Sequence, residues 1–259
     1  MASIVSRVFG LVIVSLLLCV SRMDAEPIKV RLAEGNTRGF LRVRRPGGDP
    51  IAYGELRQKP DGAVIESRLL LNFKDGSVYE ETATFSQNEV FRLEAYRLVQ
   101  RGPSFPAAEI SFARRSGRYD ARIQDKKEGE KTASGPLEMP ADLYNGLALV
   151  LLKNLAGGQG SGRMAVFTPT PRLIKMELVA EGEDRVVAGG LATTATRYLM
   201  RLEIGGVTGV IASLVGKVPP EGRYWFVTGD VPAFARFEGA LYLNGPVWRI
   251  ELMGVEWPK

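Results

Sequence analysis

The stretch AVIESRLLLNF at positions 63–73 decides the fold class, because its apolar side chains recur at every second residue. The residues on one face are apolar, namely Ile65, Leu69, Leu71 and Phe73. Those on the other face are polar: Glu66, Arg68 and Asn72. A period of two is typical of an antiparallel strand with one face buried and the other in water. The stretch therefore predicts a β-strand.

The same alternation recurs at positions 118–124 and 172–181, where apolar and charged residues again take opposite faces. Within 91–101 the parity of the apolar residues changes near Ala95 and Tyr96. A β-bulge inserts one extra residue and produces such a change, so we expect one there. Segments of this kind number about a dozen along the chain, which indicates a β-dominated protein.

Turn sequences separate the alternating runs and predict hairpins. They are Pro60-Asp61-Gly62, Lys74-Asp75-Gly76, Ser116-Gly117 and Asn244-Gly245. A three-residue loop at 74–76 pairs Ile65, Leu69 and Leu71 with Phe85, Glu81 and Tyr79, in that order. This register places Glu81 on an otherwise apolar face.

A two-residue turn at Asn244-Gly245 fixes the register of the last hairpin in the same way. It pairs Leu241 with Trp248, Gly239 with Ile250 and Phe237 with Leu252. One face is then wholly apolar, as a core-facing pair requires. The other face sets Glu238 opposite Glu251, which is unfavourable unless Arg236 or Arg249 lies diagonally between them.

One segment is helical by its pattern: DLYNGLALVLLKNL at 142–155 follows Pro140 and ends before Gly157-Gly158. It is apolar all round from Leu147 to Leu152, so we expect sheet to cover it on most sides. A second short helix fits 207–216, where the β-branched residues fit a strand nearly as well.

This order of elements predicts a mainly β, antiparallel incomplete β-barrel (a half-barrel) with one central helix packed across it. A closed barrel or a sandwich carrying the helix also satisfies the order. No Pro/Ser-rich linker interrupts the chain, so we expect residues 26–259 to form a single domain.

Residues 1–25 fit a secretory signal peptide. Arg7 precedes the apolar run VFGLVIVSLLLCV at 8–20, which is shorter than the roughly 20 residues that span a membrane. Cleavage after Ser21 or after Ala25 fits, and Ala25 is preferred. Lipoprotein anchoring through Cys19 is disfavoured, because Leu18 stands where the processing enzyme requires a small residue. We expect an exported, periplasmic protein with no integral membrane span in the mature chain.

Composition excludes several kinds of chemistry. The chain of 259 residues has no histidine and one cysteine, so nucleophiles activated by histidine and ordinary zinc sites are ruled out. We expect no metal, no cofactor and no enzymatic activity. The net charge is +5, with Arg42, Arg44 and Arg45 as its densest group. We interpret these arginines as a solvated strand edge and expect no nucleic-acid partner, because no recognition motif accompanies them.

Three segments carry a resemblance to a known family. They are GPLEMPADLYNGLALVLLKNL at 135–155, VVAGGLATTATRYLMRLEI at 186–204 and RYWFVTGDVPAFARFEGAL at 223–241. In this order they resemble a family of bacterial periplasmic proteins that carries a domain of unknown function. The resemblance implies a fold like that of the lipoprotein carriers of the bacterial envelope, an incomplete barrel whose concavity takes acyl chains. It assigns no catalytic residue.

These observations predict a non-enzymatic protein that binds a lipid or another hydrophobic ligand in the concavity of the half-barrel. The residues expected to line the concavity are Leu147, Val150, Leu151, Trp225 and Phe237. Glu81 is expected to be the polar anchor or a charge at the rim. The alternative is an envelope scaffold or protein-interaction module without a ligand cavity, and a third hypothesis, a hydrolase, requires two acidic groups to converge in a cleft.

Overall fold

A computed structural model describes residues 26–125, 129–155, 160–203 and 221–253. The expected signal peptide, with Cys19, and the expected short helix at 207–216 lie outside the described residues. Most of the described chain is β-strand, with one short helix.

Fourteen strands are described, and they form one antiparallel sheet. The strands are β1 (Thr37–Arg44), β2 (Pro50–Asp61), β3 (Val64–Phe73), β4 (Val78–Gln87), β5 (Phe91–Arg101), β6 (Ala108–Ala113), β7 (Arg118–Asp125), β8 (Gly129–Pro136), β9 (Ser161–Phe167), β10 (Leu173–Ala188), β11 (Leu191–Leu202), β12 (Gly222–Val227), β13 (Ala233–Gly239) and β14 (Trp248–Leu252). The helix α1 (Ala148–Leu155) lies between β8 and β9 in the sequence.

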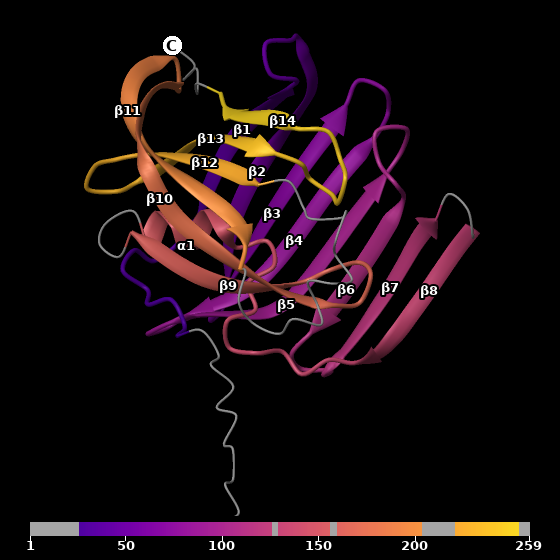
Figure 1. The fold of residues 1–259 in the computed structure, drawn as a ribbon. Helices are drawn as coiled ribbons and strands as arrows, with labels where there is room; N and C mark the ends of the chain where they lie inside the picture. Colours follow the sequence, from indigo (N-terminus) through magenta and orange to yellow (C-terminus); the bar gives the residue numbers. More distant parts are fainter. Residues whose placement is uncertain (1–25, 126–128, 156–159, 204–220, 254–259) are drawn as a thin grey trace, which may run out of the picture.

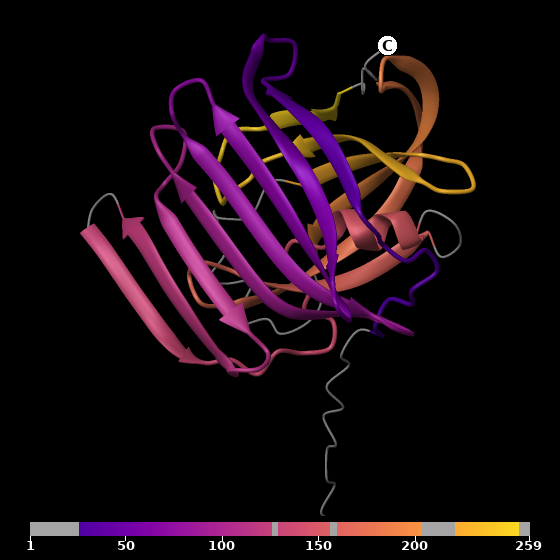
Figure 2. The ribbon, with the colours of Figure 1, turned by 180° about the vertical axis from the view of Figure 1, so that it is seen from behind.

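The sheet is curled but not closed into a barrel. Its strand order is β8-β7-β6-β5-β4-β3-β2-β1-β14-β13-β12-β11-β10-β9, so β8 and β9 are its two edges. Figure 1 shows β9 and β10 crossing in front of the strands β3 to β6. Figure 2 shows the strands β3 to β6 from the opposite side. This confirms the expected fold class, an incomplete antiparallel barrel with one helix.

The register predicted for the β3–β4 hairpin is confirmed. Ile65 pairs with Phe85, Leu69 with Glu81 and Leu71 with Tyr79. The turn that sets this register is stabilised locally, because the Asp75 carboxylate accepts a hydrogen bond of 2.9 Å from the backbone N–H of Ser77. Gly76 adopts a φ of 83°, which favours glycine. Glu81 therefore lies on the inward face, as the sequence predicts.

The bulge expected near Ala95 is also present. On β4, Thr84 pairs with Ala95 and the next residue, Phe85, pairs with Leu93. Glu94 is thus the extra residue, directly before the predicted position. The bulge keeps Leu93 and Tyr96 buried although they differ in parity.

The predicted register of the last hairpin is wrong by two residues. Gly239 pairs with Trp248 and Phe237 with Ile250, so the connection is longer than the Asn-Gly turn. A shift of two keeps every side chain on its expected face but changes its partner. Glu238 now faces Arg249, with 2.6 Å between Arg249 Nε and Glu238 Oε1. The observed register replaces the unfavourable acidic pair by a salt bridge.

The helix begins at Ala148, six residues later than the predicted start at 142. The preceding segment is extended instead, because Leu143 forms a parallel bridge with Ala165. The N–H of Ala165 donates to the carbonyl of Asp142, and the N–H of Tyr144 donates to the carbonyl of Ala165. Gly146 then turns the chain with a φ of 73° before α1 starts.

An ion pair between a buried aspartate and a partly exposed lysine holds this extended segment against β10. Asp142 has no exposed surface, and Lys175 Nζ lies 2.5 Å from its carboxylate. Two further hydrogen bonds tie the helix end to the N-terminal segment, because Asn154 Oδ1 accepts from the N–H groups of Arg31 and Leu32 at 2.8 Å each. Together these contacts fix α1 inside the curl of the sheet.

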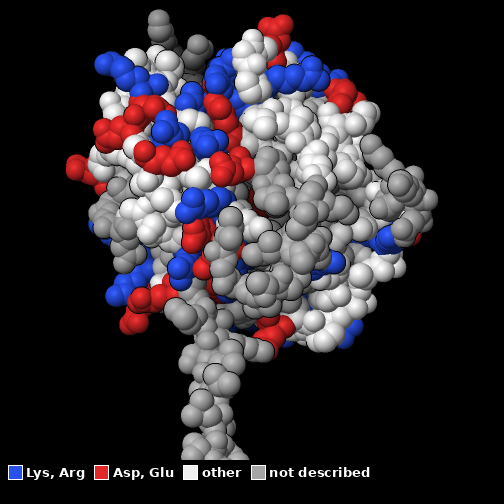
Figure 3. Space-filling view, viewed as in Figure 1, with Lys and Arg blue, Asp and Glu red and all other residues white. Residues whose placement is uncertain are grey.

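The outward face of the second half of the sheet carries a network of ion pairs. Figure 3 shows acidic and basic side chains intermingled over β10, β11 and β12. Arg197 and Arg223 both contact Glu181, at 3.0 and 3.3 Å, and Arg201 pairs with Glu177 at 3.1 Å. Exposed pairs of this kind stabilise the fold only modestly.

Candidate ligand-binding cavity

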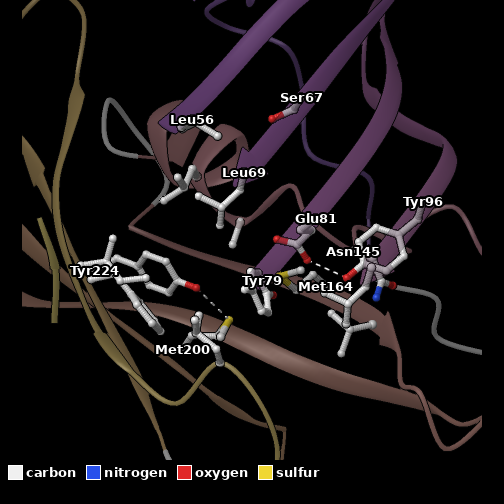
Figure 4. A pocket seen from close by; sticks show the side chains of 18 of the residues that line it. Leu56, Ser67, Leu69, Tyr79, Glu81, Tyr96, Asn145, Met164, Met200 and Tyr224 are labelled. Atoms are coloured by element: carbon white, nitrogen blue, oxygen red, sulfur yellow. Dashed lines mark hydrogen bonds between the residues drawn. The ribbon is translucent and has the colours of Figure 1, made fainter. Parts of the chain in front are cut away.

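A cavity of about 300 Å³ lies inside the curled sheet. Its walls come from the inward faces of β1 to β6, from α1 and from the strands β9 and β11 to β14. Apolar side chains form most of the lining, among them Leu56, Leu69, Ile110, Leu149, Met164 and Phe234. Figure 4 shows the leucines of β2 and β3 on one side and Met200 with Tyr224 on another. The strand alternation that buries one face of each strand thus also builds the cavity wall.

One carboxyl group points into this apolar space. Glu81 is the single acidic or basic residue among the described residues that line the cavity. Tyr96 donates a hydrogen bond of 2.6 Å from its hydroxyl to Glu81 Oε1 (Figure 4). Glu81 retains some accessible surface because it faces the cavity. Burial nevertheless raises the pKa of its carboxyl above the ordinary 4.5, and the hydrogen bond from Tyr96 offsets only part of that effect.

Three tyrosines accompany this carboxyl. Burial raises the pKa of Tyr79, Tyr96 and Tyr224 above the ordinary value for a phenol, and the nearby charge of Glu81 adds to the effect. All three hydroxyls therefore stay protonated at neutral pH, and that of Tyr96 donates its proton to Glu81. The Tyr224 hydroxyl lies 3.9 Å from the sulfur of Met200. The polar part of the cavity lining thus consists of one carboxyl, the amide of Asn145 and a small set of hydroxyls.

We expect Glu81→Gln to change how stability depends on pH. Because the pKa of Glu81 is raised, the folded protein keeps this proton at pH values where the unfolded chain, with a pKa near 4.5, has lost it. In that window the folded state binds more protons, so its stability falls as pH rises. The glutamine variant lacks this loss. As pH rises through the window, its free energy of unfolding should increase relative to that of the wild type by at most about 1.4 kcal/mol per pH unit. Chemical denaturation between about pH 4 and pH 8 measures the difference.

Glu80→Gln is the matched control. Glu80 precedes Glu81, and its carboxylate accepts a hydrogen bond of 2.7 Å from Arg68 Nε on the opposite face of the sheet. Its replacement removes the same group without touching the cavity. If the stability curves of the wild type and Glu81→Gln run parallel across this pH range, the carboxyl of Glu81 is as well solvated as one in water.

The structure places two of the six predicted site residues on the cavity wall, namely Glu81 and Phe237. Leu147, Val150 and Leu151 lie instead in the packed core, with no more than 2% of their surface exposed. The neighbouring helix residues Ala148 and Leu149 line the cavity in their place. The helix therefore does border the cavity, but by another face.

Trp225, the remaining predicted residue, lies on the outward face of β12. Its indole N–H donates to Asp184 Oδ2 at 2.7 Å, and the guanidinium of Arg236 lies 3.8 Å from the ring centroid. Together with Val186, Ala195 and Ala235 it forms a small cluster separate from the main core. Its neighbour Tyr224 points inward and lines the cavity. The expectation that Trp225 lines the cavity is therefore corrected. Successive side chains of β12 point to opposite faces of the sheet, so Tyr224 points inward and Trp225 outward.

Sequence reasoning missed several lining residues that the structure brings together. Tyr79 could have been found, because the predicted β3–β4 register places it two residues from Glu81 on the same face. Asn145 had no such signal. Its amide donates to the carbonyl of Phe167 and accepts from the N–H of Phe167, both at 2.8 Å. These bonds join the segment before α1 to the end of β9 at the cavity wall.

Two structural observations concern the whole described chain. Over the described ranges, none of the helical segments has the length and apolar character needed to cross a membrane. Among the same residues, no group of three or more His, Cys, Asp and Glu side chains is placed to hold a metal ion.

The fold and the cavity together define a curled, open antiparallel β-sheet protein with an internal apolar cavity. No protein-family model and no curated protein matches the chain. Among solved structures, the chain is similar to a β-barrel-like protein of the domain of unknown function DUF1849 from Brucella abortus. The TM-score is 0.44 at 11% sequence identity, over 85% of this chain and 96% of that chain.

Proposed function

We propose that this chain is a non-enzymatic binding protein that takes one apolar chain, such as the acyl chain of a lipid, into its internal cavity. The observation that carries the proposal is the cavity of about 300 Å³ with its apolar lining and its single carboxyl group. Small-molecule sites have this character: a mostly apolar concavity with a few polar groups, at volumes from about 300 Å³ upward. The volume favours one chain over a larger lipid.

The polar end of the ligand is proposed to lie beside Glu81 and Tyr96. A carboxyl whose pKa is raised by burial carries its proton more readily and can donate a hydrogen bond. The Tyr96 hydroxyl donates to Glu81 and so orients it. A carbonyl or hydroxyl oxygen at the head of an amphiphile can pair with this group, while the tail contacts Leu56, Leu69 and Leu149.

The absence of a second acidic group from the described lining supports a non-enzymatic function. Glycoside hydrolysis uses two carboxyl groups, and Glu81 is the single one among the described cavity residues. The proposal also places the protein in the bacterial envelope, and its support there is the sequence of residues 1–25, with Arg7 ahead of the apolar run at 8–20.

A fluorescence titration with cis-parinaric acid, a fluorescent long-chain fatty acid, tests the proposal. The protein is expressed with its own residues 1–25, purified from the periplasmic fraction of a bacterial host and stripped of lipid by solvent extraction. We expect saturable binding of one probe per chain. Emission that rises linearly without saturation, as it does on a nonspecific apolar surface, contradicts the proposal. Recovery of the protein in the cytoplasmic fraction contradicts only the proposal that the protein is exported.

The scaffold alternative has one observation in its favour. The sheet ends in two edge strands, β8 and β9. The chain's own segment at 142–145 already bonds to part of β9, whereas Figure 1 shows β7 and β8 projecting away from the rest of the molecule. An edge strand presents backbone N–H and C=O groups that another chain can pair with. Failure of the probe to bind would favour this alternative.

A further inference from the structure

A second concave feature lies on the outside of the sheet, away from the cavity. It is a groove of about 650 Å³ between the β10–β11 hairpin and the outward faces of β1, β13 and β14. Figure 1 shows the far end of this hairpin curving over towards β14. Five of the residues that line the groove are arginines, namely Arg42, Arg44, Arg185, Arg236 and Arg249. We call this set the arginine groove.

The alternation of the strands explains why the arginines gather there. In β1, Leu41 and Val43 are buried on the inward face, so Arg42 and Arg44 point outward. β1 lies between β2 and β14. The interpretation of these arginines as a solvated strand edge is therefore wrong, because β1 is an interior strand of the sheet.

Positive charge in the arginine groove exceeds the negative charge available to it. Arg42 and Arg44 share one carboxylate, Glu251, with 2.8 Å to each Nη2. Arg236 and Arg249 share a second, Glu238, at 3.5 and 2.6 Å. Arg185 is exposed and has no ion-pair partner among the residues that the structure describes. A third carboxylate, Asp184, also acts on Arg236, but it is hydrogen-bonded to Arg197 and Trp225. Five guanidinium groups thus face three carboxylates, one of which is shared with Arg197.

The contacts of Arg236 fix one of these positive charges in position. Its guanidinium stacks 3.8 Å from the centroid of the Trp225 ring, and Trp225 is fixed in turn by Asp184. Its Nε is buried and makes no hydrogen bond among the described atoms, because its ion-pair contact with Glu238 Oε1 is 3.5 Å long. Burial lowers the pKa of Arg236, and this effect outweighs the nearby carboxylate of Glu238, which raises it; the charge of Arg249 acts in the same direction as burial. A bound anion would favour the charged guanidinium, as Glu238 does.

We propose that the arginine groove binds a phosphate group. The planar guanidinium presents paired N–H donors that match phosphate oxygens, and the groove offers several such groups around one concave space. The hairpin beside it exposes 66% of Val187 and 74% of Leu191. The phosphate can therefore belong to a lipid headgroup, with these residues in the adjoining acyl layer, or to a free phosphate ion.

Two binding experiments on the full chain separate these sources. Calorimetric titration with inorganic phosphate and pyrophosphate measures the free anion, and sedimentation with phosphatidylglycerol vesicles, against phosphatidylcholine vesicles, measures the headgroup. The variants are Arg42→Gln and Arg185→Gln, both at accessible positions. Each is expected to weaken binding about tenfold, the loss typical of one charge-assisted hydrogen bond. Added salt is expected to weaken binding as well.

Arg57→Gln is the matched control. Arg57 is an exposed arginine on β2, outside the arginine groove, and its replacement removes the same charge. Loss of binding in the groove variants but not in Arg57→Gln supports the proposal. If the groove variants lose binding in the titration with phosphate ions, the ligand is a free anion. If they lose binding to the phosphatidylglycerol vesicles, the ligand is a lipid headgroup. Equal binding by all variants in both experiments, or an equal loss in Arg57→Gln, overturns the proposal.

Discussion

Leu151→Ala is expected to lower the free energy of unfolding by roughly 2–5 kcal/mol, the range for truncating a fully buried leucine. The side chain of Leu151 has no exposed surface and packs in the main core, which includes residues from β1, β5, β9 and β14. Close packing leaves little room for neighbours to collapse into the space that the truncation opens. Chemical denaturation followed by tryptophan fluorescence measures the change.

Leu149→Ala provides the comparison within the same helix. Leu149 is half-buried and borders the cavity, so its truncation enlarges an existing space and loses fewer contacts. We expect a loss of about 1 kcal/mol. The difference between two identical substitutions two residues apart shows which face of α1 meets the core. Equal losses at both positions would contradict the placement of the cavity beside Leu149.

The second prediction with a large effect concerns the filling of the cavity. Ala148 is half-buried on the cavity wall at the start of α1. The indole of Ala148→Trp is expected to occupy a large part of the volume of about 300 Å³ and to exclude a ligand chain. Overpacking of a filled core costs about 1–3 kcal/mol, whereas an existing cavity accommodates the ring with a smaller loss. We therefore expect a folded protein from which the bound acyl chain is absent.

The strand pairing of β3 and β4 could be predicted because two independent local signals agree. The alternation of Ile65, Leu69 and Leu71 fixes the faces, and the turn at 74–76 fixes the register. In the last hairpin the alternation fixed the faces equally well, but the Asn244-Gly245 turn did not join the strands directly. A shift of two residues leaves the faces unchanged, so the faces do not distinguish the two registers; the favourable pairing of Glu238 with Arg249, in place of Glu238 with Glu251, does.

The start of the helix could not be predicted, because the competing interaction is distant in sequence. Pro140 and the apolar pattern favour helix from 142 onwards, whereas Leu143 and Tyr144 pair with Ala165 of β9. Backbone hydrogen bonds to a strand satisfy the same groups that a helical turn would use. Tertiary pairing therefore outweighs the local preference until Gly146 ends the extended segment.

The candidate site was predictable to the extent that strand parity determines it. Glu81 follows from the β3–β4 register, and its inward position is confirmed. The helix offered no such guide, because a segment that is apolar all round does not show which face borders a void. Trp225 shows the same difficulty in β12, where three successive aromatic residues, Tyr224, Trp225 and Phe226, fit either parity.

Native mass spectrometry of protein purified from the periplasm, followed by solvent extraction and lipid analysis, tests the central claim most directly. It compares the wild type with Ala148→Trp and with Ala141→Trp, the same change at an exposed position outside the cavity lining. We predict an acyl species bound at near-equimolar level in the wild type and in Ala141→Trp, and its absence from Ala148→Trp. A bare protein mass in all three, or the same bound species in all three, would contradict the account.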